Sequence, residues 1–196
     1  MAVSKRAIVD AAIEILNRDG VDGLSMRTIA KALNVKVAAL YNHVSGKSEL
    51  NDEIVEYMCK NSAFPEPTDN QEAYLMAMCR AYRAMLLTVR DSTSVFENSI
   101  PTTPRRVEII HLMGSALLAL GVKFENLMTV SNMINNYVLS FTADEVRFKH
   151  QSPEAIQNFA TMLSFEQQPL FISERGFDEQ FDYGLRVLFT GLKSEE

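Results

Sequence analysis

The sequence predicts an all-α protein in which a small N-terminal unit of short helices is joined by a connecting helix to a larger helical body. Apolar residues recur at the spacing of one helix face along most of the 196 residues. Glycine and proline are scarce, and the alternation that marks strands is rare. Apolar residues make up 47% of the chain, which is enough for a sizeable core. We expect the unit at 1–47, the connecting helix at 48–63 and the body at 64–196.

The first two helices are predicted by their apolar spacing and by residues suited to their ends. Gly20 and Gly23 end the first helix and form a loop. Ser25 suits the N-cap of the second helix, and Leu24 before it is available for a hydrophobic staple. Asn34 can adopt the left-handed turn that follows. The apolar faces are Ile8, Ala11, Ala12, Ile15 and Leu16 in the first helix, and Met26, Ile29, Ala30 and Leu33 in the second.

The remaining elements are separated by breaks that contain turn-forming residues. Residues 64–70, FPEPTDN, include two prolines and predict a linker. The helix after this linker has apolar residues on more than one face, so we expect it at the centre of the body. The expected helices cover 36–43, 45 or 46 to about 61, 71–90, 107–120, 123–150, 152–164 and 177–192, with a broken segment at 91–104 and a loop at 165–176.

The net charge of −6 is unevenly distributed along the chain. Residues 1–47 carry seven Lys/Arg and four Asp/Glu, a balance of +3, and the remainder carries a balance of −9. A basic unit on an acidic body favours a small anion-binding domain attached to a domain with another task.

The sequence contains neither a predicted membrane span nor a predicted secretion signal. There is no run of 18 apolar residues, and the N-terminus MAVSKRAIVDAA lacks an uninterrupted apolar segment. We therefore expect a cytoplasmic protein in which Cys59 and Cys79 are reduced, partly buried thiols. A redox switch at these cysteines is the alternative.

The helices on either side of the turn Leu33-Asn34-Val35 form a helix-turn-helix pattern. In helix 36–43 and just beyond it, Leu40 and Val44 are spaced to face the core. Such spacing also occurs in helical proteins that do not bind DNA, and the basic charge is the second observation that favours DNA binding. The residues left facing outward are Lys36, Val37, Ala38, Ala39, Tyr41, Asn42 and His43.

The run GVDGLSMRTIAKALNVKVAALYNHVSGKSEL, residues 20–50, resembles the DNA-binding head of the TetR family of transcriptional regulators. In the body, TVRDSTSV, IPTTP, LGVKFENLMTVSNMINNYVLSF and YGLRVLFTGL are similar to the tetracycline-repressor branch of that family. The resemblance implies a homodimeric repressor whose two heads occupy successive major grooves of a palindromic operator. It also implies that a ligand in the body changes the separation of the heads and releases the DNA. An activator of the same family is the alternative.

Five residues of the head are predicted phosphate contacts. Lys47 lies in the first turn of a helix, where free N–H groups and the helix dipole favour a phosphate. Tyr41 can donate its hydroxyl to a phosphate, and Arg27 and Thr28 can hold one across the backbone. The resemblance implies the same role for His43. The alternatives are a solvated lysine and a core tyrosine.

The remaining outward residues are predicted to face the bases. Lys36 can reach guanine or a phosphate, and Asn42 can bind an adenine edge or a phosphate. Val37, Ala38 and Ala39 can contact only thymine methyl groups, so we expect recognition to depend on these methyls and on DNA shape.

The body departs from the residues by which the tetracycline-repressor branch binds its drug–magnesium chelate. Phe96 falls at the position of the metal-binding imidazole, and Ile100 at the arginine before the proline. Met78 and Tyr82 fall near the polar positions of the drug-anchoring helix. A chelated magnesium ion therefore has no evident anchor, and tetracycline is disfavoured as the effector.

We expect a mainly hydrophobic effector with one or two hydrogen-bonding groups. At least one amide on helix 123–150 should line its site, because a buried amide without a partner costs about 1–3 kcal/mol. Asn136 shares this helix, and its alternatives are solvent or a dimer interface; His111 is expected in the core or on the surface. The candidate effector residues, for each of which ordinary core is the alternative, are Phe64, Met78, Tyr82, Met85, Phe96, Ile100, Leu112, Met113 and Met128, with Ser131, Asn132 and Asn135 to orient the ligand.

Residues 123–149 and 177–193 match the helices that form the family's dimeric four-helix bundle. The candidate seam residues, for which intramolecular core is the alternative, are Val138, Phe141, Phe181, Leu185, Leu188 and Phe189.

Other classes of protein are less compatible with the sequence. There is no metal-spaced His/Cys cluster, no glycine-rich phosphate loop and no plausible catalytic triad, and His43, His111 and His150 lie far apart. We therefore expect neither an enzyme nor a bound cofactor or metal. The rival is a helical small-molecule-binding or protein-interaction adaptor, which would show no salt-dependent DNA affinity.

Overall fold

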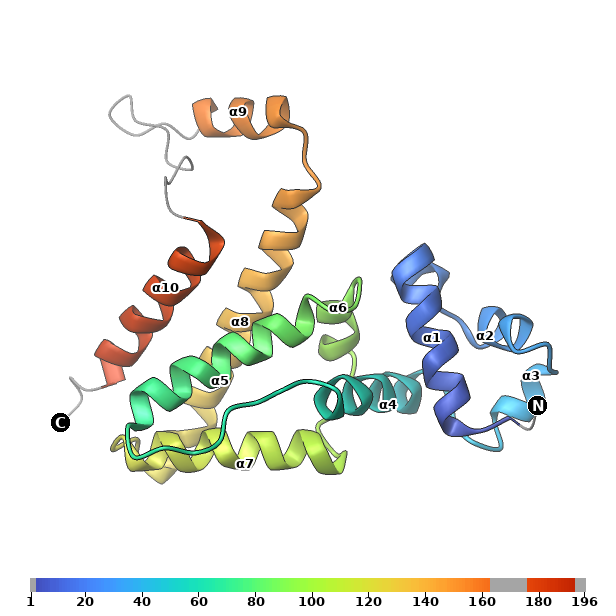
Figure 1. Ribbon diagram of the computed structural model, residues 1–196, viewed down its shortest axis with the longest axis horizontal. Helices are drawn as coiled ribbons and strands as arrows, with labels where there is room; N and C mark the ends of the chain where they lie inside the picture. The colour runs from blue at the N-terminus through green and yellow to red at the C-terminus, as the bar shows by residue number, and fades with distance from the viewer. Residues whose placement is uncertain (1–2, 163–175, 193–196) are drawn as a thin grey trace.

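The computed structural model describes residues 3–162 and 176–192 and confirms the all-α architecture. The head contains three short helices, and α4 leads from it into the body (Figure 1). The bounds are α1 Lys5–Asp19, a 3-10 turn at Val21–Gly23, α2 Met26–Ala32, α3 Val37–Leu40 and α4 Lys47–Lys60.

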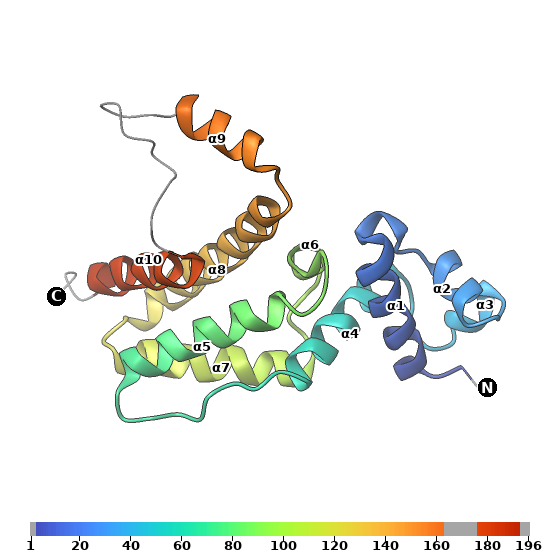
Figure 2. The same ribbon diagram turned by 45° about the horizontal axis from the view of Figure 1, so that its top comes forward.

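In the body, α5 and α7 lie side by side, and α8 leads from them to α9, as the two views in Figures 1 and 2 show. α10 packs on α8 and α5, and the head lies at the end of the molecule away from α10. No described helix is long and apolar enough to cross a membrane. The bounds are α5 Gln71–Leu86, α6 Ser92–Glu97, α7 Pro104–Ala119, a 3-10 turn at Phe124–Asn126, α8 Leu127–Lys149, α9 Pro153–Met162 and α10 Phe177–Leu192.

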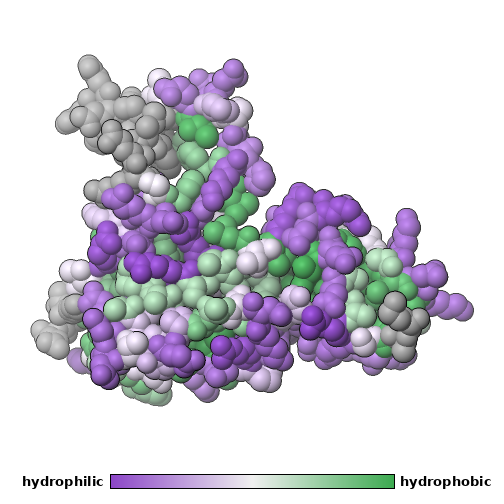
Figure 3. Space-filling view, viewed as in Figure 1, coloured by the Kyte–Doolittle hydropathy of each residue, from purple (hydrophilic) through white to green (hydrophobic). Residues whose placement is uncertain are grey.

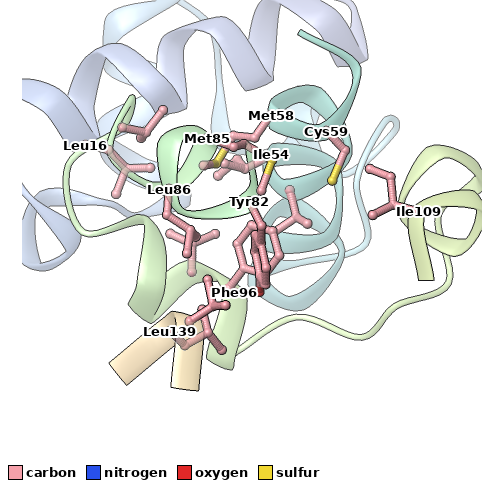
Figure 4. Packing of buried hydrophobic residues seen from close by; sticks show 14 of the residues in the cluster. Leu16, Ile54, Met58, Cys59, Tyr82, Met85, Leu86, Phe96, Ile109 and Leu139 are labelled. Carbon is pink, nitrogen blue, oxygen red and sulfur yellow. The ribbon is translucent and has the colours of Figure 1, made fainter. Parts of the chain in front are cut away.

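The expected central helix is confirmed. α5 contacts α4, α7, α8 and α10, and buried residues occur on several of its faces, from Tyr74 to Leu86. Its side chains meet those of the connecting helix and of α6 in one continuous core (Figure 4). The body and the connecting helix therefore share one close-packed core, so that a displacement of one shifts the other.

The structure confirms the N-cap and the left-handed turn that the sequence predicts for the head. Ser25 caps α2 through a reciprocal box with Thr28, in which Ser25 Oγ accepts from Thr28 N at 3.1 Å and Thr28 Oγ1 accepts from Ser25 N at 3.0 Å. Leu24 is buried. Asn34 has a φ of 54°, which is the predicted left-handed turn. The predicted break at 64–70 contains no helix.

Three predicted boundaries are wrong. α5 ends at Leu86 instead of residue 90, and the segment predicted as broken contains α6, which begins after Asp91 at a φ of 57°. The helix predicted at 36–43 is α3, which ends at Leu40 and continues as a turn closed by Val44 N donating to Leu40 O at 3.0 Å. Most of the loop predicted at 165–176 lies outside the described residues.

Most residues of the predicted dimer seam are buried within one chain. Val138, Phe181, Leu185 and Phe189 are each at most 1% exposed without any partner chain, so they belong to the intramolecular core between α8 and α10. Phe141 and Leu188 are half-buried against this core.

Candidate functional site

The side of the helix-turn-helix unit that the sequence predicts to face outward is exposed to solvent in the structure. Leu40 and Val44 are buried, and they fix α3 against the head. Tyr41 is 53% exposed, and Asn42 is exposed beside it. Lys36, Ala38 and Lys47 are exposed, whereas Val37, Ala39 and His43 are half-buried.

The cations of the head fall into two groups. Lys5 pairs with Glu49 and Glu53, Arg6 pairs with Asp10, and Arg18 pairs with Asp19, so their charges are neutralised locally. Within the described residues, no ion pair reaches the four remaining cations, Arg27, Lys31, Lys36 and Lys47. All four are exposed and lie on α2 or at the starts of α3 and α4. Within the described part of the head, the cations without an ion pair are therefore those of the helix-turn-helix unit and of the start of α4.

Lys31 was not among the residues selected from the sequence. It is exposed and lies four residues after Arg27 in α2, so the two side chains share one side of that helix. The i, i+4 spacing of two cations was the signal that could have identified it.

The structure changes the expected roles of Thr28 and of the first turn of α4. The Thr28 hydroxyl lies 2.8 Å from Gly23 O, to which it donates, and it also accepts in the capping box, so its polar capacity is used within the head. Ser45 N donates to Glu49 Oε2 at 2.7 Å, and this hydrogen bond is the main reason that the pKa of Glu49 falls to about 2. A carboxylate therefore lies beside the first turn of α4, and the Lys47 ammonium supplies positive charge there.

The end of α1 is joined to the turn that precedes α6. Val21 N donates to Asp91 Oδ2 at 2.8 Å, and Arg90 N donates to Asn17 Oδ1 at 3.0 Å. Gly20 lies within this contact at a φ of 75°, and a Cβ there would stand 2.7 Å from Asp91 Oδ2. This contact could not be predicted from local sequence patterns, because it joins residues about 70 positions apart.

A second contact joins α4 to the segment that runs into α7. Glu56 is 4% exposed and accepts from Arg105 N at 3.1 Å to each carboxylate oxygen and from Arg106 N at 3.3 Å. Its carboxylate therefore occupies the N-terminus of α7, where it is favoured by the helix dipole. Lys60 pairs with the same carboxylate at 2.8 Å.

Part of the predicted effector set is brought together in the core beside α4. The rings of Tyr82 and Phe96 lie 5.4 Å apart, and Figure 4 shows them next to each other. Tyr82 Oη donates to Asn135 Oδ1 at 3.0 Å, so this amide on α8 has the partner that burial requires. Met78 and Met85 are buried in the same core.

The rest of the predicted set is dispersed. Ile100 is 59% exposed and Met128 is 72% exposed, so neither lines an enclosed site within this chain, and Asn132 is also exposed. Phe64, Leu112, Met113 and Ser131 are half-buried, whereas Asn136 and His111 lie on the surface.

A cleft of about 680 Å³ lies outside the predicted set. It is bounded by residues 86–93 and 142–150 and by Asn17 of α1. In Figure 3 the surface is hollowed in this region, between the head and the arm that α8 and α9 form.

The chemistry of the cysteines is that of buried thiols. Burial raises the pKa of Cys59 to about 11 and that of Cys79 to about 12, so both stay protonated and poorly nucleophilic at neutral pH. Within the described ranges, no three His, Cys, Asp or Glu side chains gather in a way that could hold a metal ion.

Two family profiles match the chain. The profile described as "Bacterial regulatory proteins, tetR family" matches residues 8–54, and the profile described as "Tetracyclin repressor-like, C-terminal domain" matches residues 64–195. Among curated relatives, the tetracycline repressor protein class A from transposon 1721 of Escherichia coli is 28% identical and covers 94% of this chain and 88% of its own length.

Solved structures share the fold over the whole chain. Apo ActR from Streptomyces coelicolor is 23% identical, with a TM-score of 0.86 over 99% of this chain and 96% of that chain. BioQ with its double-stranded DNA operator is 26% identical, with a TM-score of 0.75 over 98% of this chain and 99% of that chain.

Proposed function

Since the chain belongs to the TetR family of bacterial regulatory proteins, we propose that it is a ligand-responsive DNA-binding repressor that acts as a homodimer on a palindromic operator. Members of this family are transcriptional regulators rather than enzymes, and we assign this chain no catalytic role. We place the DNA-binding head at 1–47, the connecting helix at 48–63 and the ligand-binding and dimerisation domain at 64–196. Operator binding requires access to the chromosome, so the proposed site of action is the cytoplasm.

The observation that supports DNA binding most directly is the segregation of cations in the head. The cations elsewhere on the head are paired with carboxylates, whereas those beside Tyr41 and Asn42 have no such partner among the described residues. An unpaired cation keeps its full attraction for phosphate and releases counterions from DNA when it binds. The proposed phosphate contacts are Arg27, Lys47 and the Tyr41 hydroxyl, with His43 at their edge, and Lys31 joins them.

We propose that bases are contacted chiefly by Lys36 and Asn42, with methyl contacts from Val37, Ala38 and Ala39. This small set supports recognition by thymine methyls and DNA shape. Replacing operator thymines by uracil removes only the methyl groups, so affinity should fall. Unchanged affinity across the series would contradict methyl recognition while leaving DNA binding intact.

The proposed effector is a mainly hydrophobic small molecule held near Tyr82 and Phe96. The surrounding core is rich in methionine and aromatic groups, and Asn135 supplies a polar end. We do not propose a tetracycline–magnesium chelate, because Phe96 is apolar where a metal-binding imidazole would be needed.

For the dimer face we propose the exposed apolar side chains on α8 and α10. Met133 is 49% exposed, Tyr183 is 53% exposed and Val187 is 55% exposed. Tyr183 and Val187 are four residues apart and share one side of α10, opposite to the buried residues of that helix. We propose these exposed side chains as the dimer face in place of the seam residues predicted from the sequence, most of which are buried within one chain.

The DNA-binding proposal is tested by operator affinity measured over a series of salt concentrations. Lys47→Ala should weaken binding to the DNA that flanks the gene and lower the salt slope by about two, because a dimer loses two phosphate contacts. Tyr41→Phe should weaken binding without changing the slope. The matched control is Arg6→Ala, which removes a cation already paired with Asp10 and should leave the slope unchanged. Salt-independent binding, or no binding, would favour the adaptor alternative. Equal slopes for the folded Lys47→Ala and Arg6→Ala variants would exclude Lys47 as a phosphate contact.

A further inference from the structure

Arg106 is a half-buried cation without a carboxylate partner. It lies in the first turn of α7, and its Nη1 donates to Ser99 Oγ at 2.7 Å. Within the described part of the chain, no carboxylate oxygen lies within ion-pair distance of its guanidinium, whereas the adjacent Arg105 pairs with Glu108 at 2.8 Å. A guanidinium carries five N–H donors, so most of its hydrogen-bonding capacity is left for another group.

The comparison with Arg83 shows that this chain otherwise neutralises a buried arginine. Arg83 is 7% exposed and lies 2.7 Å from carboxylate oxygens of both Glu145 and Asp178. Burial lowers the pKa of Arg106, and this outweighs the opposing influences of Tyr82, Cys59 and Asp52, the last of which acts from beyond ion-pair distance. Because an arginine does not lose its proton in proteins, the charge persists and is poorly solvated.

The side chains next to this cation belong to the part of the core where we propose that the effector binds. The guanidinium carbon of Arg106 lies 4.9 Å from the centroid of the Phe96 ring. Phe96 in turn contacts Tyr82, and the Tyr82 hydroxyl is bonded to Asn135. A cation, two aromatic faces and an amide therefore follow one another across the core (the rings are seen in Figure 4).

We propose that Arg106 is the anchor for the carboxylate of an aromatic acid that serves as the effector. A carboxylate can accept two parallel hydrogen bonds from a guanidinium, and an aromatic ring can stack on Phe96 and Tyr82. Asn135 can bind a second polar group of the same molecule. This inference rests on the proposed function, because it names the class of effector to which the repressor responds.

The position of Arg106 also connects such a ligand with the connecting helix. The backbone N–H groups of Arg105 and Arg106 are held by Glu56 of α4. A ligand that draws the Arg106 side chain toward itself acts on the turn that carries these N–H groups. Binding at Arg106 is thus coupled to α4 through one helical turn.

The test compares aromatic acids with their neutral amides at equal concentration. The probes are 2-naphthoate and anthracene-9-carboxylate, each beside its primary amide, with melting temperature and operator release by fluorescence anisotropy as the measurements. The acids should raise the melting temperature and release operator at concentrations at least tenfold below those of the amides. Arg106→Met should abolish this preference, and the control Arg105→Met should retain it.

A second measurement needs no ligand. If the charge of Arg106 is kept for a ligand, Arg106→Met should melt at or above the temperature of the unliganded wild type, because an unpaired, poorly solvated charge is removed. A melting temperature lowered by several degrees would assign Arg106 a structural role and overturn the proposal. Equal action of acids and amides, or no action by any of them, would also overturn it, while salt-dependent operator binding would still support the regulator itself.

Discussion

The carboxylate of Glu56 should stabilise the junction between the connecting helix and the body, and Glu56→Gln tests this. The side chain is 4% exposed and lies at the N-terminus of α7, where it accepts from the N–H groups of Arg105 and Arg106. Glutamine keeps one acceptor oxygen, loses the charge and places an NH₂ group against N–H donors.

The expected loss follows from these contacts. A hydrogen bond to a charged group contributes about 1.5–3 kcal/mol, and a partly buried charge at a helix end contributes up to about 2 kcal/mol. Glutamine retains part of the first contribution and avoids the desolvation of a carboxylate. We therefore expect the free energy of unfolding to fall by about 2 kcal/mol, which lowers the melting temperature of a chain of this size by about 4–8 °C.

The same residue predicts a pH dependence. Burial alone would raise the pKa of Glu56, but the ion pair with Lys60 and the N–H donors of α7 outweigh it, so the pKa lies below its usual range. A carboxyl group whose pKa is lower in the folded state stabilises the fold fully above the unfolded pKa of about 4.3. The contribution is lost as the pH falls through the folded pKa, so the difference between wild type and Glu56→Gln should shrink below about pH 4.

Urea unfolding followed by circular dichroism at pH 7 and at pH 3.5 measures both effects. Glu108→Gln is the control, because Glu108 pairs with Arg105 on the surface of the same helix and its loss should change stability by less than about 1 kcal/mol. A Glu56→Gln variant as stable as the control at pH 7, or one whose deficit grows on acidification, would contradict this role of the carboxylate.

Three further changes are predicted from other contacts. Gly20→Ala should lower the free energy of unfolding by about 1–3 kcal/mol, because the backbone there favours glycine and the new Cβ meets Asp91; wild-type stability in urea would contradict this. Arg83→Met should cost about 1–3 kcal/mol, because Glu145 stays buried and keeps Lys149 as its remaining partner, and adding Glu145→Leu should recover part of the loss in a double-mutant cycle. Val187→Asp should convert dimers to folded monomers in analytical ultracentrifugation, and a dimer of unchanged affinity would exclude α10 from the interface.

The head could be predicted from sequence because its determinants are local. The capping box begins at Ser25, the left-handed turn needs only Asn34, and the spacing of Leu40 and Val44 defines the inner face of α3. Each of these signals acts within a few residues, so it can be read without knowing what packs nearby.

The body was harder to predict because its important contacts join distant residues. An apolar spacing such as that of Phe181, Leu185 and Phe189 predicts a buried face, but it does not distinguish the chain's own core from a partner's surface. The short helix α6 was missed since its start depends on Asp91, whose left-handed backbone is held by a contact with α1.

α6 lies between two contacts, one with the turn that follows α1 in the head and one with the connecting helix α4. At one end, Asp91 accepts from Val21 N, immediately after α1. At the other, Asn51 Nδ2 donates to Asn98 O at 3.1 Å, and Ile100 N donates to Asp52 Oδ1 at 2.7 Å, both from α4. The six residues between these contacts form α6.

Phe96, which lies on α6, is therefore the point at which a ligand in the core can act on both the contact with the head and the contact with the connecting helix. A ligand that stacks on Phe96 and binds Arg106 must displace α6 or the first turn of α7, and a helix of six residues is too short to absorb that displacement internally. Hydrogen bonds of about 1 kcal/mol each hold either contact. Shifting two or three of them gives a coupling of about 1–3 kcal/mol, which corresponds to a change in operator affinity of about 5- to 150-fold. A ligand that binds the shifted arrangement more tightly by this amount is therefore sufficient to change operator affinity by that factor.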